Sequence, residues 1–475
     1  MLKDMSEAKQ FYIGGNLTSS SETTVIKNPY INSEIAHIHL AQKEHIDKSI
    51  LAAQEAFQIT SQYSSYERSV ILQSIASQLK QRKEEFAQLI TAEAGKPITF
   101  SSAEVDRAVS TFEIASEEAK RINGEVLSLD VTAPTKGKQG IVNRFPIGII
   151  ACISPFNFPL NLAVHKIAPA IAAGCPIILK PASATPLSTL ELAKIIARME
   201  LPKGAVSILP MDRKTGNQLV TNGQIALLSF TGSPEVGWKM KQEAGKKKVV
   251  LELGGNAGVI ITPTADLELA VKRCIAGGFA YSGQICIHVQ RIFVQKLLFG
   301  KFTGLFMEAV KRMHTKNPED HATEMSVMID EENAKRVEAW VNEAIKAGAK
   351  LLCGGKREGT YYQPTVLTNT NTAMKVNCEE VFGPVVIIEP YEQFSDATAM
   401  INDSRFGLQA GIFTNEIREM DEAFAKLQVG GVILNDVPLV RFDHMPYGGV
   451  KDSGQGREGV KYAIMDMMEA RILVK

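Results

Sequence analysis

The chain has 475 residues, of which 45% are hydrophobic and 22% charged, and at this length two packed domains are the usual outcome. Lys and Arg together number 52, as do Asp and Glu, so no excess charge would draw nucleic acid or an anionic membrane surface. The longest apolar run is too short to span a bilayer, and the first residues lack the apolar stretch of a signal peptide. We predict a cytoplasmic protein whose partner is a small molecule, neither nucleic acid nor membrane.

Six cysteines are scattered along the chain, with no CxxC pair and no close grouping with histidine. This pattern argues against a disulfide framework and against a structural zinc site. We therefore expect reduced thiols and no metal.

The opening third of the chain has a helical pattern. Apolar residues recur at every fourth position in residues 43–57 and 66–90, as at Ile71, Ile75 and Leu79, which predicts amphipathic helices. From residue 147 the pattern changes to short apolar runs, each followed by a stretch that can form a helix. Such alternation predicts βαβ crossovers around a buried parallel sheet. These runs are residues 147–154, 175–180, 205–210 and 225–232.

A second series of the same kind starts after Gly254 and Gly255, with runs at 257–262, 290–295, 384–391, 408–414 and 431–436. The predicted fold class is therefore α/β, with two Rossmann-like, doubly wound domains. The segment 124–146 is rich in Val, Thr and Gly and predicts an exposed β-hairpin, which the C-terminal tail would join to form a small pairing arm. We place the first domain at residues 1–122 and 142–253, the second at 254–449, and the arm at 123–141 and 450–475.

Cys286 follows Ser282, Gly283 and Gln284 in a segment with few charges. A small, flexible approach would leave this thiol accessible, and an accessible thiolate is the strongest ordinary side-chain nucleophile at neutral pH. A buried core thiol is the other interpretation, and the spacing alone leaves both open.

Two further polar side chains stand in or beside apolar runs. Glu252 interrupts the apolar stretch VVLELGGN, residues 249–256, and a double glycine follows it. A buried carboxyl must be paired or have its pKa raised; a raised pKa suits a general base, whereas a salt bridge is the alternative. Asn157 lies just beyond the run 147–154, at the edge where ligands bind in open α/β sheets. Its amide could cap the next helix or donate a hydrogen bond to a developing oxyanion.

The segment 229–237 carries a weaker signal for phosphate. Gly232 and Ser233 come before a helix that should begin near Pro234, and the free N–H groups and dipole of a helix N-terminus attract phosphate. The GxGxxG fingerprint is absent, so spacing does not establish a dinucleotide site.

Taken together and in chain order, seven motifs resemble those of the aldehyde dehydrogenase superfamily. They are SPFNFP, ILKPA, FTGSPEVG, LELGGN, GQICIHVQR, EEVFGPV and PYGGVKDSGQGREG. The resemblance spans nearly the whole chain and implies the aldehyde dehydrogenase fold, with a cofactor-binding first domain, a catalytic second domain and an oligomerisation arm. It further implies NAD- or NADP-dependent oxidation of an aldehyde to a carboxylate by a homodimer or homotetramer.

The resemblance also implies the roles of three residues. Cys286 would be the nucleophile, forming first a thiohemiacetal and then a thioester. Glu252 would be the general base that hydrolyses the thioester, and Asn157 would stabilise the oxyanion together with the backbone N–H of Cys286. This order of events splits one difficult oxidation into two easier steps.

For the cofactor, Lys180 matches the lysine that reaches the adenosine ribose, and Ser233 matches the pyrophosphate contact. Ser183 stands where many NAD-preferring members have Glu, so an acceptor for the ribose 2′-OH and a charge that repels a 2′-phosphate are both missing. The preference between NAD and NADP therefore stays open. The cofactor-binding positions that the resemblance implies are Ser154, Pro155, Phe156, Lys180, Ala182, Ser183, Gly216, Phe230, Gly232, Ser233, Leu253, Glu380 and Phe382.

The stretch VRFDHMPYGGVKDSGQGREG is most similar to the subgroup of lactaldehyde, phosphonoacetaldehyde and non-phosphorylating glyceraldehyde-3-phosphate dehydrogenases. Their substrates are small and several are anionic, which would call for a cationic clamp. Arg107, His288, Arg441 and His444 are the candidates, although for each of them packing or a structural salt bridge is the more common role. Two alternatives remain: a CoA-acylating dehydrogenase, against which Glu252 argues, and a catalytically silent structural or binding protein on the same fold.

Overall fold

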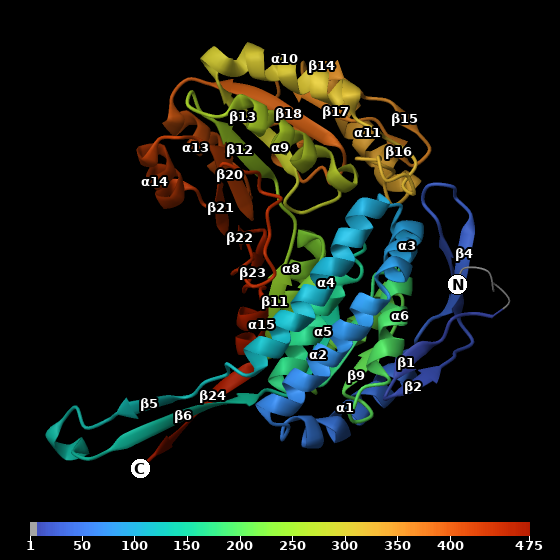
Figure 1. Ribbon diagram of the computed structural model, residues 1–475, viewed down its shortest axis with the longest axis vertical. Helices are drawn as coiled ribbons and strands as arrows, with labels where there is room; N and C mark the ends of the chain where they lie inside the picture. The colour runs from blue at the N-terminus through green and yellow to red at the C-terminus, as the bar shows by residue number, and fades with distance from the viewer. Residues whose placement is uncertain (1–6) are drawn as a thin grey trace.

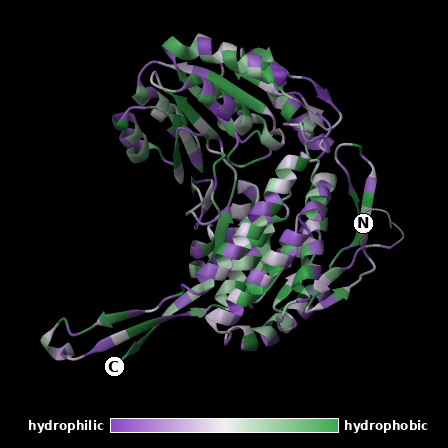
Figure 2. Ribbon diagram, viewed as in Figure 1, coloured by the Kyte–Doolittle hydropathy of each residue, from purple (hydrophilic) through white to green (hydrophobic). Residues whose placement is uncertain are grey.

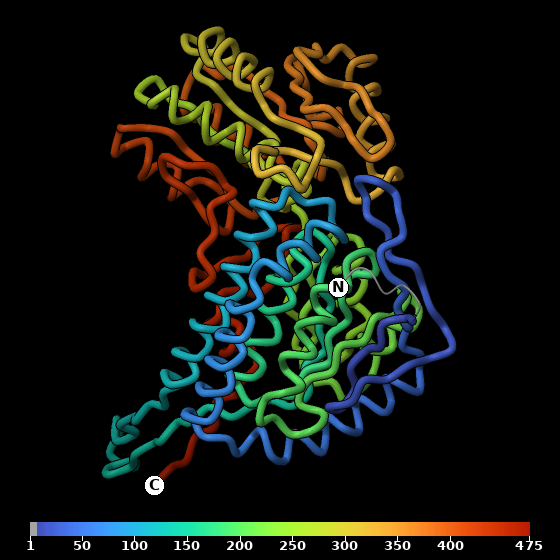
Figure 3. The backbone as a smooth tube through the Cα atoms, turned by 45° about the vertical axis from the view of Figure 1, so that its right-hand side comes forward, coloured from blue at the N-terminus to red at the C-terminus, as the bar shows by residue number. Residues whose placement is uncertain are grey.

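The computed structural model describes residues 7–475 as two α/β bodies with a projecting arm (Figure 1). The lower body contains an eight-stranded sheet and the upper body a seven-stranded sheet. The chain passes between them at residues 253–256, from β11 (Lys248–Glu252) to β12 (Ala257–Ile261). The turned view in Figure 3 shows the same two bodies and the same arm. The predicted α/β fold with two sheets is confirmed.

The first sheet has the strand order β2-β1-β9-β8-β7-β10-β11-β23. Its five central strands are parallel: β7 (Ile149–Ile153), β8 (Ile177–Lys180), β9 (Val206–Ile208), β10 (Ile225–Thr231) and β11. In chain order the winding runs from β7 outward to β9 and then restarts at β10 on the other side of β7. Ligands of doubly wound sheets bind beyond the carboxyl ends of the strands at such a reversal.

Helices cover both faces of this sheet, so its central strands are apolar along their length. Every residue of β7 and β8 is buried, as expected for a parallel sheet covered on both sides. The helices in front of this sheet carry both green and purple segments in the hydropathy view (Figure 2). Helix α5 is also buried at every position, including His165 and Lys166. The crossover helices are α5 (Asn161–Ala173), α6 (Leu187–Ile196), α7 (Arg213–Thr221) and α8 (Pro234–Glu243).

The helices predicted for residues 43–57 and 66–90 are present, although residues 11–39 form strands rather than helices. Short strands β1 (Phe11–Ile13) and β2 (Asn16–Thr18) extend the first sheet, and β3 (Thr23–Lys27) pairs with β4 (Glu34–His39). Strand β1 joins β9 through Tyr12 and Ile208, a long-range pairing that local periodicity cannot reveal. The helices are α1 (Lys43–Thr60), α2 (Ser65–Gln81), α3 (Lys83–Ala94) and α4 (Ile98–Ala119).

The second sheet has the order β14-β17-β18-β13-β12-β20-β21, and all its predicted apolar runs are strands. Its strands besides β12 are β13 (Val289–Gln295), β14 (Lys350–Cys353), β17 (Thr365–Thr368), β18 (Val385–Tyr391), β20 (Gln409–Phe413) and β21 (Gly431–Leu434). Its helices are α9 (Leu267–Phe279), α10 (Lys296–Arg312), α11 (Glu331–Lys346), α12 (Lys375–Cys378), α13 (Phe394–Asn402) and α14 (Ile417–Lys426). Short elements elsewhere are η1 (Ala133–Thr135), η2 (Ala280–Gly283), β15 (Arg357–Glu358), β16 (Tyr361–Tyr362), β19 (Phe406–Gly407) and β22 (Val450–Lys451).

The arm is a three-stranded antiparallel sheet in the order β24-β6-β5, at the lower left of Figure 1. It comprises β5 (Glu125–Ser128), β6 (Gln139–Pro146) and β24 (Met468–Val474). The boundaries predicted for the arm differ from these. Strand β23 (Gly454–Gln455) pairs with β11, and helix α15 (Val460–Asp466) packs on α5 through a buried apolar face, so these two elements lie with the first sheet. Conversely, β6 pairs with β24 as far as Pro146, beyond the predicted limit at residue 141.

A buried ion pair ties the helical layer to the loop after β7. Lys96 and Glu104 are both fully buried and form a salt bridge. The second carboxylate oxygen of Glu104 accepts hydrogen bonds from the backbone N–H groups of Leu160 (3.0 Å) and Asn161 (3.1 Å) at the start of α5. The Lys96 ammonium also lies 3.9 Å from the ring centroid of Phe158. One glutamate thus neutralises a buried cation and caps a buried helix.

Replacing Glu104 by alanine is expected to destabilise the protein by about 3–5 kcal/mol, because the Lys96 charge would stay buried without a partner. Differential scanning fluorimetry should show a clear fall in the apparent melting temperature. Glu117→Ala on the same helix removes an exposed pair with Lys120 and should cost at most about 1 kcal/mol. Equal melting temperatures for Glu104→Ala and Glu117→Ala would contradict this account.

No helix in residues 7–475 is long and apolar enough to cross a membrane.

Candidate active site

The predicted catalytic side chains meet between the two bodies. Asn157 follows β7 and Glu252 ends β11, so both lie at the carboxyl edge of the first sheet. Cys286 comes just before β13, and Glu380 just before β18, so both lie at the amino edge of the second sheet. The double glycine permits this close approach. A Cβ atom at position 255 would lie 2.2 Å from the Cys286 carbonyl oxygen, so only glycine fits there. The N–H of Gly255 donates to Glu380 Oε1 at 3.0 Å.

The loop that carries Cys286 is strained and firmly anchored. Tyr281 (φ 45°), Ser282 (φ 55°) and Gly283 (φ 68°) are consecutive left-handed residues, a conformation that costs non-glycine residues of order 1–3 kcal/mol each. The Tyr281 hydroxyl donates to the Ala94 carbonyl at 2.9 Å, and the Ser282 hydroxyl donates to the Ser326 carbonyl at 2.9 Å. The surrounding structure therefore imposes this turn and fixes the position of Cys286.

The Cys286 side chain is half-buried, and its Sγ lies 3.1 Å from the Tyr447 hydroxyl. Burial raises the pKa of the thiol to about 12, and the hydrogen bond from Tyr447 acts in the opposite direction. Cys152 and Cys274, by comparison, have no exposed surface. Cys286 therefore differs from a core thiol in having both partial access and a polar partner.

Glu252 is only 4% exposed, and neither of its carboxyl oxygens has a hydrogen-bond partner among the described residues. No salt bridge to Glu252 occurs within the same part of the chain, so the structural ion pair considered for it is not formed. Burial, reinforced by the negative charge of Glu458, raises the pKa of Glu252 well above its ordinary value. A buried, unpaired carboxyl with a raised pKa is suited to general-base work.

The Asn157 amide links the first sheet to the Cys286 loop. Its Nδ2 donates to the Gln284 carbonyl at 2.9 Å, and its buried Oδ1 has no partner within residues 7–475. An amide nitrogen has two N–H groups, so one remains for a further acceptor near the sulfur. The helix cap considered for this residue is absent because Glu104 caps α5 instead.

A network of buried charges lies beside these residues. Glu458 accepts from Arg441 at 2.8 Å and from Lys166 at 3.2 Å, and these two cations hold its pKa at about 2 despite burial. Asp443 pairs with Arg107 at 2.6 Å and with His165 at 2.8 Å. Arg441, Lys166 and Arg107 thus face the carboxylates of Glu458 and Asp443, and the charges of Arg441 and Lys166 also act on the third buried carboxyl, Glu252. The network has excess positive charge while Glu252 is protonated.

The comparisons with known proteins agree with this geometry. The sequence profile of the aldehyde dehydrogenase family matches residues 17–473. The chain belongs to this family. It is 41% identical over 476 residues to 3-sulfolactaldehyde dehydrogenase of Priestia aryabhattai, covering 100% of this chain and 99% of that protein.

Two solved structures are similar over nearly their full length. Aldehyde dehydrogenase 21 from Physcomitrella patens, in complex with the reaction product succinate, has a TM-score of 0.97 and 45% identity, covering 99% of this chain and 98% of that one. Glyceraldehyde-3-phosphate dehydrogenase GapN from Methanocaldococcus jannaschii, complexed with NADP, has a TM-score of 0.92 and 37% identity, covering 96% and 100%. The chain is an aldehyde dehydrogenase that uses NAD or NADP and oxidises a small aldehyde.

The carboxyl edge of the first sheet offers this aldehyde dehydrogenase the donors that a dinucleotide needs. Lys180 is only 7% exposed, and its ammonium donates to nothing nearer than the Pro181 carbonyl at 3.4 Å. The hydroxyls of Ser154 and Thr231 are buried without partners among the described residues. Ser233 precedes α8 without capping it, which leaves N–H groups free for a phosphate. These orphaned donors fit a ribose and a pyrophosphate.

The remaining predicted cofactor positions surround these donors. Gly216 lies against the Lys180 side chain, Gly232 against Phe230, and Leu253 against Gly237. Phe156 from the first body and Phe382 from the second meet edge to face at 5.8 Å, while Pro155 and Ala182 are half-buried and Ser183 is exposed. Burial raises the pKa of Glu380 to about 7.

The four candidates for a cationic clamp fall into different environments. Arg107 and Arg441 lie in the charge network, and the buried Arg441 Nε has no partner among residues 7–475. His444 is exposed. His288 is 4% exposed, and burial lowers its pKa to about 4, which argues against a positive charge on this ring and favours the packing role.

Sequence reasoning did not single out Tyr447, which contacts Cys286, nor four members of the network: Glu458, Lys166, Asp443 and His165. Tyr447 and Glu458 both lie in the motif PYGGVKDSGQGREG, which served only as a family signature. Lys166 lies in a helix that is apolar apart from Asn161, His165 and Lys166 itself, and that pattern was a usable signal because a buried cation requires a partner. Within residues 7–475, no group of three or more His, Cys, Asp or Glu side chains is arranged to hold a metal ion.

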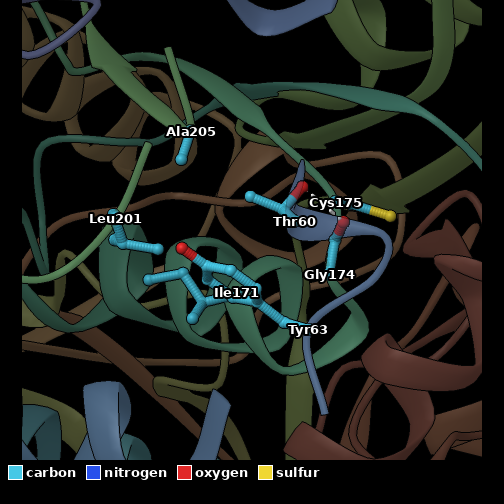
Figure 4. A pocket seen from close by; sticks show the side chains of 7 residues that line it. All are labelled: Thr60, Tyr63, Ile171, Gly174, Cys175, Leu201 and Ala205. Carbon is cyan, nitrogen blue, oxygen red and sulfur yellow. Dashed lines mark hydrogen bonds between the residues drawn. The ribbon is translucent and has the colours of Figure 1, made fainter. Parts of the chain in front are cut away.

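A small pocket far from this chemistry is shown in Figure 4. Its lining residues are Thr60, Tyr63, Ile171, Gly174, Cys175, Leu201 and Ala205. The Thr60 hydroxyl donates to the Gly174 carbonyl at 2.9 Å, so this hydroxyl is already satisfied. None of the predicted catalytic residues lines this pocket.

Proposed function

We propose that this aldehyde dehydrogenase oxidises a small anionic aldehyde to its carboxylate, with Cys286 as nucleophile, Glu252 as base and Asn157 as oxyanion donor. The observation that carries the proposal is the position of the half-buried Cys286 thiol, which shares one site with an unpaired buried carboxyl and with a network of excess positive charge. A neutral aldehyde would make no use of that excess charge.

The chemistry follows from what each side chain can do. The Cys286 thiolate attacks the aldehyde carbon, and the oxyanion that forms accepts hydrogen bonds from the free Asn157 N–H and the backbone N–H of Cys286. NAD or NADP, held by donors such as Lys180, Ser154 and the N–H groups after Ser233, would supply the hydride acceptor for this carbon. Glu252 then takes a proton from a water molecule that attacks the thioester, and collapse of the adduct releases the carboxylate and returns the electron pair to sulfur.

The anionic substrate class is supported by Arg441 and Arg107. The buried Arg441 Nε has no partner among the described residues, and an unsatisfied buried donor favours an anionic acceptor. The names of the relatives agree: sulfolactaldehyde and glyceraldehyde 3-phosphate carry anionic groups, and succinate, bound to aldehyde dehydrogenase 21, is itself an anion. Lactaldehyde, which names other relatives, is the small 2-hydroxy but uncharged alternative.

The cofactor proposal is that NADP is accepted as well as NAD. Ser183 is exposed and places no carboxylate beside the ribose position. Burial and the positive charge of Arg213 lower the pKa of Lys180 to about 8, and the negative charge of Asp212 acts in the opposite direction. Two neighbouring cations without an acidic competitor at residue 183 are suited to a 2′-phosphate.

The test is a steady-state panel that follows cofactor reduction with NAD and with NADP. Sulfolactaldehyde, glyceraldehyde 3-phosphate, succinic semialdehyde, lactaldehyde and propanal span anionic, hydroxylated and plain aldehydes. We expect the highest kcat/KM for an anionic member and turnover with NADP. A higher value for propanal would refute the anionic class, acyl-CoA as the main product on addition of coenzyme A would refute hydrolysis, and turnover with NAD alone would refute the cofactor proposal.

Arg107→Gln is expected to lower kcat/KM for the preferred anionic aldehyde about tenfold or more, because a charge-assisted hydrogen bond contributes about 1.5–3 kcal/mol. The value for propanal should change far less. Arg121→Gln, at an exposed arginine just beyond α4, is the matched control and should leave both values unchanged. A parallel loss with both aldehydes would show that Arg107 acts only through folding.

We also propose a homodimer or homotetramer in the cytoplasm. Three strands form the arm, and its exposed apolar side chains include Val126, Val131, Ile472 and Leu473, a surface that favours association. The six free cysteines suit a reducing compartment. A monomer by light scattering at micromolar concentration would refute the assembly, and fractionation of the native cells would test the compartment.

A further inference from the structure

The phenol of Tyr447 makes a direct contact with the reactive sulfur. Its Oη lies 3.1 Å from Cys286 Sγ, and the residue is only 2% exposed, so water does not compete for this contact. A phenylalanine would fill nearly the same volume without the hydrogen bond. The hydroxyl therefore adds an interaction that packing does not require.

The phenol can act here only as a donor once the sulfur is ionised, because a thiolate has no proton to give. Burial raises the pKa of Tyr447 well above its ordinary value of 10.0, and the negative charge of the Cys286 thiolate acts in the same direction. Tyr447 thus keeps its proton at neutral pH and presents it to the sulfur.

Three further contacts hold this phenol in place. The backbone of Tyr447 exchanges two hydrogen bonds with that of Glu458, at 2.9 and 2.6 Å. The Glu458 side chain pairs with Arg441 at 2.8 Å, and the Arg441 guanidinium lies 3.8 Å from the centroid of the Tyr447 ring. The backbone hydrogen bonds, the salt bridge and the cation–π contact together restrain the position of the ring, so Tyr447 is a preorganised donor.

We propose that Tyr447 is a catalytic residue whose hydroxyl donates a hydrogen bond to the Cys286 sulfur whenever that sulfur carries negative charge. The inference rests on the proposed role of Cys286 as nucleophile. The hydrogen bond from Tyr447 acts at two stages of the reaction. The first is before attack, when the thiol proton has gone to solvent, and the second is during hydrolysis, when the C–S bond breaks and its electron pair returns to sulfur. The phenol keeps its own proton at both points.

The other groups that face the sulfur do not replace this donor. Glu252 and Glu380 oppose ionisation of the thiol, whereas the charge of Arg441 favours it. Among residues 7–475, Tyr447 is the side chain that forms a hydrogen bond with the sulfur. Loss of its hydroxyl should therefore leave the thiolate with charge compensation from Arg441 but without a direct donor.

The first test is Tyr447→Phe, read by the rate at which iodoacetamide alkylates Cys286 in the cofactor-free protein as a function of pH. The apparent pKa of the thiol should rise by about one unit, since a hydrogen bond to a charged group is worth about that much, and kcat should fall about tenfold. The KM for cofactor should not change. Tyr462→Phe removes the hydroxyl of a half-exposed tyrosine on α15 and should change none of these values.

Superimposable alkylation profiles for wild type and Tyr447→Phe would overturn the proposal. A second test places 3,5-difluorotyrosine at position 447, which keeps the ring but makes the phenol a stronger donor. The thiol pKa should then fall, and an unchanged or higher pKa would equally overturn the proposal. Alkylation reports on the sulfur without any turnover, so failure of the proposed aldehyde oxidation is a separate outcome from failure of this hydrogen bond.

Discussion

Cys286→Ala is expected to abolish aldehyde oxidation, with kcat falling by a factor on the order of 10⁴ or more, as is usual when a covalent nucleophile is removed. Without the sulfur no thiohemiacetal can form, so the carbon never reaches the state from which hydride leaves. Cofactor binding should persist, because its donors at Lys180 and Ser154 lie on the first sheet, away from the Cys286 loop.

The measurement is cofactor reduction by stopped flow, together with calorimetric titration of the cofactor. Cys378→Ala is the matched control: Cys378 is also half-buried and free, but it lies at the end of α12, and its loss should leave kcat unchanged. Residual turnover in Cys286→Ala within tenfold of wild type would remove Cys286 from the mechanism.

Glu252→Gln has the second largest expected effect. The variant should reduce about one equivalent of cofactor per active site and then stall, because the thioester forms but no base activates the hydrolytic water. Steady-state kcat should fall about 10²–10⁴-fold. Mass spectrometry of the quenched enzyme should find the acyl group on Cys286. Loss of the first turnover as well would mean that Glu252 acts before the thioester forms.

The pH dependence provides an independent check on Glu252. Because burial and Glu458 raise its pKa, Glu252 is protonated and inactive as a base at low pH and becomes active as pH rises through the elevated pKa. Hydrolysis of the thioester in the wild type should therefore accelerate with pH above the ordinary carboxyl range. This rise of the hydrolysis rate with pH should be missing in Glu252→Gln. If the rise persists in that variant, a group other than Glu252 causes it.

The central strands of both sheets were predictable because parallel strands covered on two faces are apolar throughout, as in Ile149–Ile153 and Ala257–Ile261. Strands β14 and β17 of the second sheet were not predicted. The position of Asn157 at the carboxyl edge of the first sheet was predictable for a related reason, because it directly follows such a strand. That Glu252 ends β11 at the same edge was not predicted. The N-terminal strands were not predictable. Three-residue strands such as Phe11–Ile13 have almost no periodicity, and only the edge of a distant sheet makes them strands.

The placement of the C-terminal segments likewise could not be predicted from local sequence. Met468–Val474 joins the arm, whereas Val460–Asp466 packs on α5 in the first body. No local feature separates these neighbouring segments, because the division depends on which partner surface each one meets. We therefore predicted an arm of β-strands, but with boundaries that differ from those of its strands in the structure.

The amino-acid sequence by itself determined the α/β class, the two sheets, and the residue types from which a thiol, a carboxyl and an amide could be chosen for chemistry. Tertiary structure alone decided their electrostatic state. Tyr447 contacts Cys286 from 161 positions away, Glu458 neutralises Arg441, and burial makes His288 neutral. The physical reason is that periodicity depends on neighbours along the chain, whereas pKa, pairing and access depend on distant segments that exclude water together.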